Sequence, residues 1–570
     1  MKIKSLVTKQ NDKIDIGDFT VLVGPNNVGK SQTLIDIHSK MRNGFNTKTT
    51  IIKEIDFEKP STFEELIDGL NVEEDPTNTT LHLISGILSD LKSGVKIQFN
   101  LTEHKRLFNE MPDLNFILGN ISKFHISFLD AASRLVVAQT ALSYNPHTEV
   151  PKNLLQALFG SNLDLKLEDS LRKAFKDAFD MDIVLDYSGM KELMFRVATI
   201  IKEMPEDPRK AYPVASKYEK LDKQGDGFRS FVGVVLSLLL SKGRIVLLDE
   251  PEAFLHPAQA KLLGAWIAEN SKNFSSQIII ATHNANFLWG ILASSQDIDI
   301  YRLNREEDRT SYNRMTSDAT SKLVNSPLLS SQRVLEAIFY KGVVVCEADA
   351  DRSVYYTVSV RKFKNQNILF IHAHNKQVIK DVVNLLKEAT IPISAITDID
   401  IINNEPDFKS LLKALNGGSI PEKIFKWRNK IAESIEETNE ELIIEKLKKE
   451  INEFTKQLEE NKHTLLGARA ALRRINKEIT KWDPVKRLGI KGIPEQEKRT
   501  ARELIKLARS RGLFIVPVGE LESWLKLGTR QKKKWIVLAL KALHRDESST
   551  KLNNFVSNIL KYMGEKITIQ

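Results

Sequence analysis

The sequence predicts an α/β protein that consists of two parallel-sheet domains, each interrupted by an inserted segment. Short apolar stretches alternate with amphipathic ones in the first half of the chain, and the same alternation begins again at Gly342. A run of heptad-spaced apolar residues between 444 and 479 interrupts the second alternation, which is typical of helices inserted into a domain.

The overall composition allows this organisation and narrows the class of protein. The chain has 570 residues, 42% of them hydrophobic, and at about 100–200 residues per domain it can form two to four cores. It has 1 cysteine and no secretion signal pattern, so we expect a cytoplasmic protein. The apolar run 231–240 is too short for a membrane span of about 20 residues, so no membrane partner is expected. A net charge of +9 permits nucleic-acid binding. A basic surface that is merely solvated would give the same excess of positive charge.

The first predicted domain opens with strands that lead into a glycine-rich loop. We expect strands at Ile3–Val7, Lys13–Ile16 and Thr20–Val23, and a helix over 32–43. The loop at 24–31 has the sequence GPNNVGKS. In such a P-loop, backbone N–H groups surround phosphates, the lysine reaches the β- and γ-phosphates and the serine ligates Mg²⁺. The sequence therefore predicts ATP with Mg²⁺ (or Mn²⁺), held by Asn26, Asn27, Gly29, Lys30 and Ser31.

The stretch from about 50 to 220 shows no single strong pattern, and we interpret it as an insertion that supplies some dimerisation helices. Amphipathic helices are expected there at Asn153–Phe159 and Leu171–Phe179. Beyond it the first domain resumes, with helix Phe228–Ser241, strand Arg244–Leu248, helix Pro257–Asn270 and strand Gln277–Ala281.

Two acids and a histidine follow the strands of this resumed core. Asp249 ends a buried apolar strand and would ligate Mg²⁺, and Glu250 would polarise the attacking water. His283 follows the next strand and would sense the γ-phosphate. Alternatively, the two acids cap a helix and the histidine has only a structural role. The P-loop favours the catalytic interpretation, because nucleotide hydrolysis at a P-loop needs carboxylate partners.

The run DEPEAFLHP at 249–257, with ATHN at 281–284, resembles the ABC-type ATPases, in the branch that contains the structural-maintenance and OLD (overcoming lysogenisation defect) proteins. The resemblance implies a signature motif that contacts the nucleotide of a partner subunit, and hence a homodimer or higher homo-oligomer. The segment QGDGFRS at 224–230 occupies that place and departs from the Leu-Ser-Gly-Gly-Gln form, but Gly227 and Arg229 keep anion-binding chemistry at a helix start. Gln139 is the candidate for the family's Q-loop glutamine.

A polar stretch, Asn304–Ser331, is interpreted as a boundary, which gives domains at 1–330 and 335–570. The second alternation then comprises strand Gly342–Cys346, helix Arg352–Val360, strand Asn367–Ile371, helix Lys376–Ala389, strand Ile393–Thr397 and strand Leu513–Val518. An insertion at about 420–505 separates the last two strands. Its apolar seam favours a coiled coil or a long helical hairpin, with the polar Asn461 fixing register; an amphipathic helix lying on its own domain is the alternative.

Six carboxylates follow three of these strands. They are Glu347, Asp351, Asp398, Asp400, Glu520 and Glu522. The ends of parallel strands lie together, and the i, i+2 pairs share one side if the backbone stays extended. Oxygen ligands suit Mg²⁺ or Mn²⁺, and two such ions can activate water and stabilise the leaving oxygen in phosphodiester cleavage.

The order Glu, then Asp-x-Asp, then Glu-x-Glu resembles the TOPRIM fold of topoisomerases, primases and OLD nucleases, although Ala348 stands where glycine is usual. The resemblance implies that Glu347, Asp398 and Asp400 are catalytic, that these three and Asp351 are metal ligands with Glu520 or Glu522 completing the site, and that a late lysine assists. Lys551 and the cluster Arg530–Lys534 are both candidates for that lysine.

An ABC-type ATPase domain followed by TOPRIM is the OLD-family order. It implies an ATP-regulated DNA endonuclease and, by analogy with Gabija-type and retron-associated effectors, an anti-phage role. The expected partners are DNA and, for a retron, a reverse transcriptase with its non-coding RNA and DNA, or another defence subunit. The alternatives are a nucleotide-switched scaffold with a degenerate TOPRIM site and, less favoured, a topoisomerase or primase.

Overall fold

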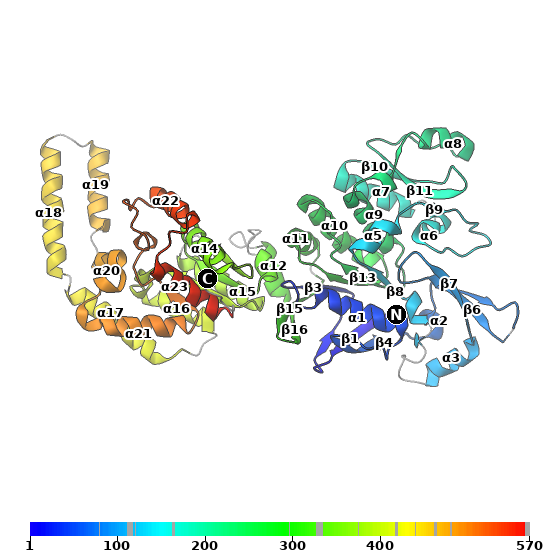
Figure 1. Ribbon diagram of the computed structural model, residues 1–570, viewed down its shortest axis with the longest axis horizontal. Coiled ribbons are helices and arrows are strands. Elements are labelled where there is room, and N and C mark those ends of the chain that lie inside the picture. The colour runs from blue at the N-terminus through cyan, green and yellow to red at the C-terminus, as the bar shows by residue number, and fades with distance from the viewer. Residues whose placement is uncertain are drawn as a thin grey trace. The chain divides into compact units, whose positions relative to one another are not determined.

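The computed structural model shows a mixed α/β chain (Figure 1). Its description covers residues 1–78, 80–110, 118–119, 121–161, 166–295, 297–325, 335–373, 376–416, 420–438, 440–460, 464–478 and 481–564. Contacts divide the chain into two compact units, Met1–Phe339 (unit 1) and Tyr340–Gln570 (unit 2). None of the helices within the described ranges is both long and apolar enough to cross a membrane.

Unit 1 is centred on a six-stranded sheet with the order β16-β15-β3-β14-β13-β8. The strands are β3 (Phe19–Val23), β8 (Ile126–Leu129), β13 (Ile245–Asp249), β14 (Gln277–Ala281), β15 (Asp299–Glu306) and β16 (Arg309–Arg314). All pairs are parallel except β15–β16. Every residue of β3 and β14 is buried, as expected for strands that are covered on both faces. This order places β14 between the P-loop strand and the strand that ends in Asp249.

Helices cover this sheet. They include α1 (Lys30–Asn43), α5 (Ala131–Val137), α9 (Asp226–Leu239), α10 (Pro257–Asn270), α11 (Ala285–Ser294) and α12 (Ser317–Asn325). The predictions for α10 and β14 are confirmed residue for residue, and α1 begins two residues before its predicted start. The polar stretch at the predicted boundary contributes β16 and α12 to unit 1 as far as Asn325, within the predicted first domain of 1–330; residues 326–331 lie outside the described ranges.

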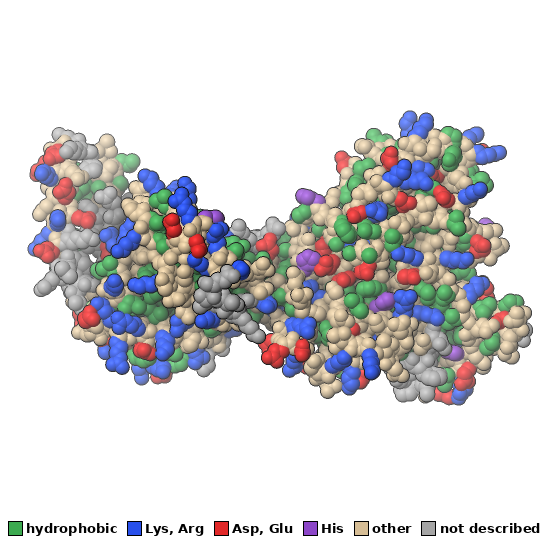
Figure 2. Space-filling model, viewed as in Figure 1, with side chains coloured by type: hydrophobic (Ala, Val, Ile, Leu, Met, Phe, Trp, Pro, Cys, Tyr) green, Lys and Arg blue, Asp and Glu red, His purple; other side chains and the backbone are tan. Residues whose placement is uncertain are grey.

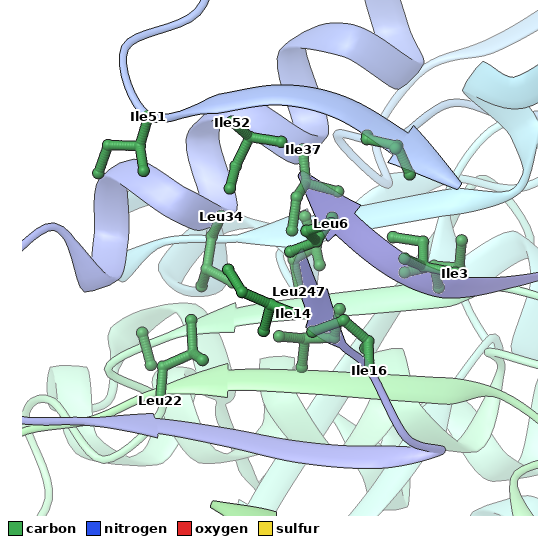
Figure 3. Close-up of a cluster of buried hydrophobic side chains, with 14 of the residues drawn as sticks. Ile3, Leu6, Ile14, Ile16, Leu22, Leu34, Ile37, Ile51, Ile52 and Leu247 are labelled. Carbon is green, nitrogen blue, oxygen red and sulfur yellow. The ribbon is translucent and has the colours of Figure 1, made fainter. Parts of the chain in front are cut away.

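A smaller sheet covers α1 on its far side. It has the order β2-β1-β4, from β1 (Lys2–Thr8), β2 (Lys13–Asp15) and β4 (Ile52–Glu58). Its apolar side chains meet those of α1 and the central sheet in one buried cluster (Figure 3). The buried Gln277 joins the two sheets, because its side chain accepts from Ile3 N and donates to Ile3 O, both at 2.8 Å. The amino-terminal strands are therefore part of the nucleotide-binding core.

The stretch from about 50 to 220 was expected to be one insertion, but the core strand β8 lies inside it. Before β8 comes a three-stranded sheet of β5 (Asn71–Glu74), β6 (His82–Ile87) and β7 (Gly94–Phe99). After it comes a sheet of β9 (Ala141–Leu142), β10 (Asp182–Asp186), β11 (Glu192–Ala198) and β12 (Glu219–Lys220), with helices α6 (Leu154–Ser161), α7 (Lys166–Phe179) and α8 (Pro208–Ala215). The strand β8 was not predicted, because its four residues, ISFL, are too few to show a strand pattern in the sequence.

Unit 2 contains a four-stranded, fully parallel sheet with the order β18-β17-β19-β20. The strands are β17 (Gly342–Cys346), β18 (Ile368–His372), β19 (Ile393–Thr397) and β20 (Leu513–Ile515). The flanking helices are α14 (Asp349–Phe363), α15 (Lys376–Glu388), α16 (Glu405–Asn416), α22 (Lys532–His544) and α23 (Thr550–Tyr562). β20 ends before the predicted Val518, although Val516 N still donates to Thr397 O at 2.9 Å.

The segment between β19 and β20 is helical. It comprises α17 (Glu422–Thr438), α18 (Glu440–Glu459), α19 (Leu465–Glu478), α20 (Asp483–Leu488) and α21 (Lys498–Arg509). α18 and α19 form a hairpin in which Leu447 and Phe454 pack on Ala468 and Ala471. Among the other seam positions whose side chains are described, the exposed ones are Ile444, Ile451, Leu458, Leu465 and Leu472; the side chain of Ile475 is not described. Asn461 and Ile479 lie outside the described residues.

Candidate functional site

The loop between β3 and α1 depends on glycines. Gly24 has φ 138°, and a Cβ added there would lie 2.5 Å from the carbonyl oxygen of Leu303 on β15. Gly29, with φ 103°, is the N-cap of α1. Asn26 and Asn27 are exposed on the loop between them. The backbone therefore adopts a tight turn that ends at a helix N-terminus, which is the geometry that binds phosphate.

Lys30 lies against its own loop. Its Nζ donates to the carbonyl oxygens of Gly24 at 2.8 Å and Pro25 at 2.7 Å. Burial lowers the pKa of Lys30 to about 8, against the opposing effect of nearby carboxylates, chiefly Glu250 and Asp249. A bound phosphate would offer this amine stronger, charged acceptors than the two carbonyls do.

Ser31 and Asp249 meet across the sheet, where Ser31 Oγ donates to Asp249 Oδ1 at 2.7 Å. Burial raises the pKa of the Asp249 carboxyl, the hydrogen bond from Ser31 lowers it, and the charge of Glu250 raises it again. A hydroxyl and a carboxylate that converge beside a P-loop are the oxygen ligands that Mg²⁺ prefers, so this pair fits the expected ion.

Glu250 and His283 form a second pair, at the ends of β13 and β14. His283 Nδ1 lies 2.7 Å from Glu250 Oε1, and Glu250 adopts the left-handed φ of 50°. Their hydrogen bond is the main cause of both shifts, since it raises the pKa of His283 and lowers that of Glu250. Two residues predicted from separate motifs therefore contact each other.

Sequence reasoning missed the residue that fixes these acids. Arg134 on α5 is fully buried, and its guanidinium donates to the carbonyl oxygens of Asp249 at 2.6 Å and Glu250 at 2.8 Å. Its Nε donates to Ser230 Oγ on α9 at 3.2 Å. Asp130 gave an available signal, because it forms a capping box at the start of α5 directly after a core strand.

Glu252 is the second residue that was missed. Its carboxylate is 3% exposed and accepts a hydrogen bond from Thr282 Oγ1 at 2.6 Å, and burial raises its pKa to about 7. It ties the loop after β13 to the end of β14, next to His283. The acids from Asp249 to Glu252 belong to one sequence motif, and nothing in their spacing predicts that Glu252 turns inward.

The signature-like segment packs on that same loop. α9 begins at Asp226, whose carboxylate forms an ion pair with Arg229. A Cβ on Gly227 would lie 3.0 Å from Phe254 O, so the two backbones are in close contact. Gln139 lies just beyond α5, where the neighbouring Thr140 bonds to Asp222 through its N and Oγ1. The roles predicted for Gly227, Arg229 and Gln139 in nucleotide binding stay predictions.

In unit 2, the sheet order brings three acidic strand ends together. β17 and β19 are neighbours, and so are β19 and β20, with all three strands parallel. Glu347 follows β17, Asp398 follows β19, and Glu520 follows β20 after a short loop. Asp351 lies one turn into α14, the helix after β17.

The two i, i+2 acidic pairs do not lie on extended backbone, so that expectation is wrong. Asp398 is the N-cap of a 3-10 turn over Ile399–Ile402, and Glu520 is the N-cap of another over Leu521–Ser523. Asp400 and Glu522 therefore lie inside these turns. Backbone hydrogen bonds close these turns, from Ile401 N to Asp398 O at 3.2 Å and from Ser523 N to Glu520 O at 3.0 Å, and neither N-cap side chain makes a capping bond.

The electrostatics of these acids show that they crowd one another. Burial raises the pKa of Asp351; Lys532 opposes the shift and Glu522 adds to it. Burial and Glu522 raise the pKa of Glu520, and Arg530 opposes them. The carboxylates of α14 and of the loop after β20 therefore share one electrostatic environment.

The donor set suits a hard cation, since it consists of carboxylate oxygens. Within the described ranges, however, no three His, Cys, Asp or Glu side chains lie close enough together to hold a metal ion. Asp400 instead pairs with Lys486 of α20, at 3.2 Å between Oδ2 and Nζ. Metal binding would require these side chains to rearrange.

Two family models match the chain in order. Residues 188–288 match the model described as "AAA domain, putative AbiEii toxin, Type IV TA system". Residues 338–400 match the model described as "Overcoming lysogenization defect protein-like, TOPRIM domain". This is the ATPase–TOPRIM architecture of the OLD family. The first match includes Asp249, Glu250 and His283, and the second includes the acids from Glu347 to Asp400.

Individual proteins match smaller or larger shares of the chain. The chain is 27% identical over 135 residues to "Probable ABC transporter ATP-binding protein p29" of Mesomycoplasma hyorhinis, over 22% of this chain and 53% of that protein, so it spans about half of this curated relative. Among solved structures, "Crystal structure of the SmcHead bound to the C-winged helix domain of ScpA" matches with 14% identity and a TM-score of 0.32, over 55% of this chain and 98% of the other. "SMC head domain from Thermotoga maritima" matches with 15% identity and a TM-score of 0.28, over 55% and 100%.

The structure shows where the two candidates for the late lysine implied by the OLD resemblance lie. Lys532, within the cluster Arg530–Lys534, lies near enough to Asp351 for its charge to oppose the rise in the pKa of that carboxyl. Lys551, at the start of α23, borders the same cavity as Glu522. Lys532 acts directly on one of the acids and Lys551 only shares a cavity with another, and the choice between them stays open.

Proposed function

We propose that this chain is an ATP-regulated, divalent-metal-dependent DNA endonuclease of the OLD type. One observation carries the proposal: in the parallel sheet of unit 2, Glu347, Asp398 and Glu520 follow three adjacent strands. Carboxylates gathered at one sheet edge suit Mg²⁺ or Mn²⁺, which in pairs activate water and stabilise the leaving oxygen in phosphodiester hydrolysis.

The residues of unit 2 divide this work. Glu347, Asp398 and Asp400 would hold the catalytic ions, and Asp351, Glu520 and Glu522 would complete the ligand set. Asp400 must first leave Lys486, its present partner at 3.2 Å. The released ammonium could then neutralise a phosphate oxygen of the substrate.

In unit 1, Lys30 and the loop backbone would hold the phosphates of ATP, while Ser31 and Asp249 hold Mg²⁺. Glu250 would orient the attacking water, with its charge maintained by His283 at 2.7 Å. Closure of two ATPase units on shared nucleotides, with the Gly227 and Arg229 segment of one facing the P-loop of the other, would regulate the nuclease. This dimer and the anti-phage role with a retron or Gabija-type partner rest on the family resemblance alone.

The test is cleavage of plasmid DNA in Mg²⁺ or Mn²⁺ by wild type, Glu347→Ala and Lys30→Ala. Glu347→Ala is expected to abolish cleavage, and Lys30→Ala to remove its dependence on ATP. Glu495→Ala is the matched control, because that acid lies in the same unit with its side chain 87% exposed. Cleavage that survives in Glu347→Ala would refute the assignment of the site.

A second candidate, a nucleotide-switched scaffold with a degenerate TOPRIM site, is favoured by the ion pair between Asp400 and Lys486. Calorimetric titration with Mn²⁺ separates the two. A nuclease should bind the ion with an affinity that Glu347→Ala lowers, whereas a scaffold should show no carboxylate-dependent binding.

A further inference from the structure

Unit 2 contains a cavity of about 1000 Å³ beside the acidic strand ends. Its walls come from α20, α21, the loop after β20 and α23. Among the described residues that line it, Glu522, the second acid of the Glu-x-Glu pair, is the only acidic one. The cavity therefore adjoins the proposed nuclease site and has an opposite charge.

One cationic wall is formed by the chain that returns from the helical insertion. It carries Arg487 at the end of α20, Lys491 in the following turn, and Arg502 and Arg509 on α21. On the face drawn in Figure 2, Lys and Arg side chains also gather over α17 and α21. This wall therefore concentrates positive charge on one side of the opening.

Three more cations lie on the remaining walls: Lys526, Arg530 and Lys551. In the described part of the chain, none of the cations that line the cavity takes part in an ion pair. Seven like charges around one space repel each other, and an anionic ligand would relieve that repulsion.

The cationic wall is held rigidly against the loop that carries Glu520 and Glu522. A Cβ on Gly489 would lie 2.1 Å from Pro517 O, and a Cβ on Gly519 would lie 2.1 Å from Lys486 O, so the two backbones interlock. Ile490 N donates to Pro517 O at 3.0 Å. The site is therefore preformed by main-chain packing, which lowers the cost of binding.

The cavity also has an aromatic wall. Trp524 is 5% exposed, and its Nε1 donates to Tyr355 OH at 3.0 Å, which fixes the plane of the ring. Phe555 lies beside it, with 5.2 Å between ring centroids. A simple inorganic anion would leave this apolar surface unused, and an apolar ligand would leave the cations unused. A flat heterocycle that carries a phosphate would use both.

We propose that this cavity binds a nucleoside phosphate, either as a free mononucleotide or as a nucleotide of an unpaired nucleic-acid strand. Bases in a duplex are stacked and paired, so only an unpaired nucleotide can place its ring against the half-buried Phe555, which Trp524 supports from behind. The strand source rests on the proposed nuclease function, because Glu522 joins the cavity to the acids. In that case an unpaired nucleotide lies next to the scissile phosphate.

The test uses the full chain with Lys30→Ala, which disables the P-loop as a competing nucleotide site. Thymidine monophosphate, inorganic phosphate, a single-stranded oligonucleotide and a blunt duplex are titrated without metal, with calorimetry and tryptophan fluorescence as readouts. Lys491→Glu with Arg509→Glu should weaken nucleotide or single-strand binding about tenfold or more, since each removes a charge-assisted contact. Arg499→Glu is the control, because this exposed residue is on α21 but does not line the cavity.

Saturable binding of the mononucleotide supports the free-ligand source, and binding of the single strand alone supports the strand source. Inorganic phosphate binding as tightly as the mononucleotide, equal binding of the blunt duplex, no saturable binding, or insensitivity to the charge reversals would overturn the proposal. The assay needs neither cleavage nor metal, so its failure is distinct from failure of the nuclease assignment, which Glu347→Ala tests.

Discussion

Lys486 Nζ lies 3.2 Å from Asp400 Oδ2, so a residue carried by the end of the helical insertion neutralises an acid at the end of β19. The two residues are far apart in sequence, and the insertion between them extends through the hairpin of α18 and α19. The insertion is thus connected to the acidic site through its returning chain, α20, whose next residue, Arg487, borders the cavity.

Removing Lys486 should make metal binding easier. In wild type the ion must replace the ammonium on Asp400, and a partly exposed ion pair of this kind is worth about 0.2–1 kcal/mol. We expect Lys486→Ala to lower the Mn²⁺ concentration at half-maximal binding by up to about fivefold in calorimetry. Lys506→Ala, an exposed site on α21, is the control. An unchanged or higher Mn²⁺ requirement would show that the ammonium does not compete with the ion.

The pKa of about 8 at Lys30 predicts a pH-dependent affinity for ATP. Phosphate binding needs the charged amine, so above pH 8 the free protein must take up a proton to bind. The dissociation constant should be nearly constant below pH 8 and rise about tenfold per pH unit above it. Calorimetry between pH 7.5 and 9.5 in buffers of different ionisation enthalpy would detect both the weakening and the proton.

The matched variant for this prediction is Lys30→Arg. A guanidinium stays charged over this range, so any remaining affinity should be independent of pH and no proton should be taken up. A wild-type affinity that does not change up to pH 9.5 would contradict the pKa shift.

The sequence predicted most of the two sheets because their strands are short, apolar and buried on both faces. It also placed Lys30, Ser31, Asp249, Glu250 and His283 at one site, and the structure joins these residues through the pairs Ser31–Asp249 and Glu250–His283. Such side chains follow directly from strand ends, so knowing the strands was enough to place them.

What the sequence could not supply depends on contacts between distant segments. Arg134 bonds to the backbone of Asp249 from a helix in the stretch expected to be an insertion, and no spacing rule links the two. The turns at Asp398 and Glu520 were not predicted because short backbone hydrogen bonds beyond the strand ends, such as Ile401 N to Asp398 O, have no periodic signal in the sequence. The cavity likewise arises from close packing at Gly489 and Gly519, which no motif describes.

Arg134 should be required both for stability and for ATP hydrolysis. Arg134→Met would remove the guanidinium donor from the carbonyl oxygen of Asp249, at a cost of about 1–3 kcal/mol, whereas that of Glu250 would keep its bond from Ala253 N at 2.9 Å. We expect a lower melting temperature and a loss of ATPase activity. Arg209→Met, at a side chain 86% exposed, should change neither. Normal hydrolysis by folded Arg134→Met would show that the guanidinium does not position the acids.

Glu252 should make unit 1 less stable at high pH. Its carboxyl has a pKa of about 7 when folded and 4.5 in the reference state, so between these values the folded chain holds a proton that the unfolded chain has lost. By linkage, stability falls as pH rises from 4.5 to 7 and then stays level, with a total cost on the order of 3 kcal/mol. Glu252→Gln keeps an acceptor for Thr282 and removes the titration.

Thermal unfolding of both proteins from pH 5 to 8.5 tests this assignment. Because a neutral amide pays no cost for losing a proton, Glu252→Gln should gain stability relative to wild type as pH rises, and the difference should stop growing above pH 7. Glu269→Gln, on the last turns of α10, is the control for an exposed acid of the same unit. A constant difference between Glu252→Gln and wild type over the whole range would mean that Glu252 is ionised in the folded chain throughout, with Arg134 or His283 compensating its charge.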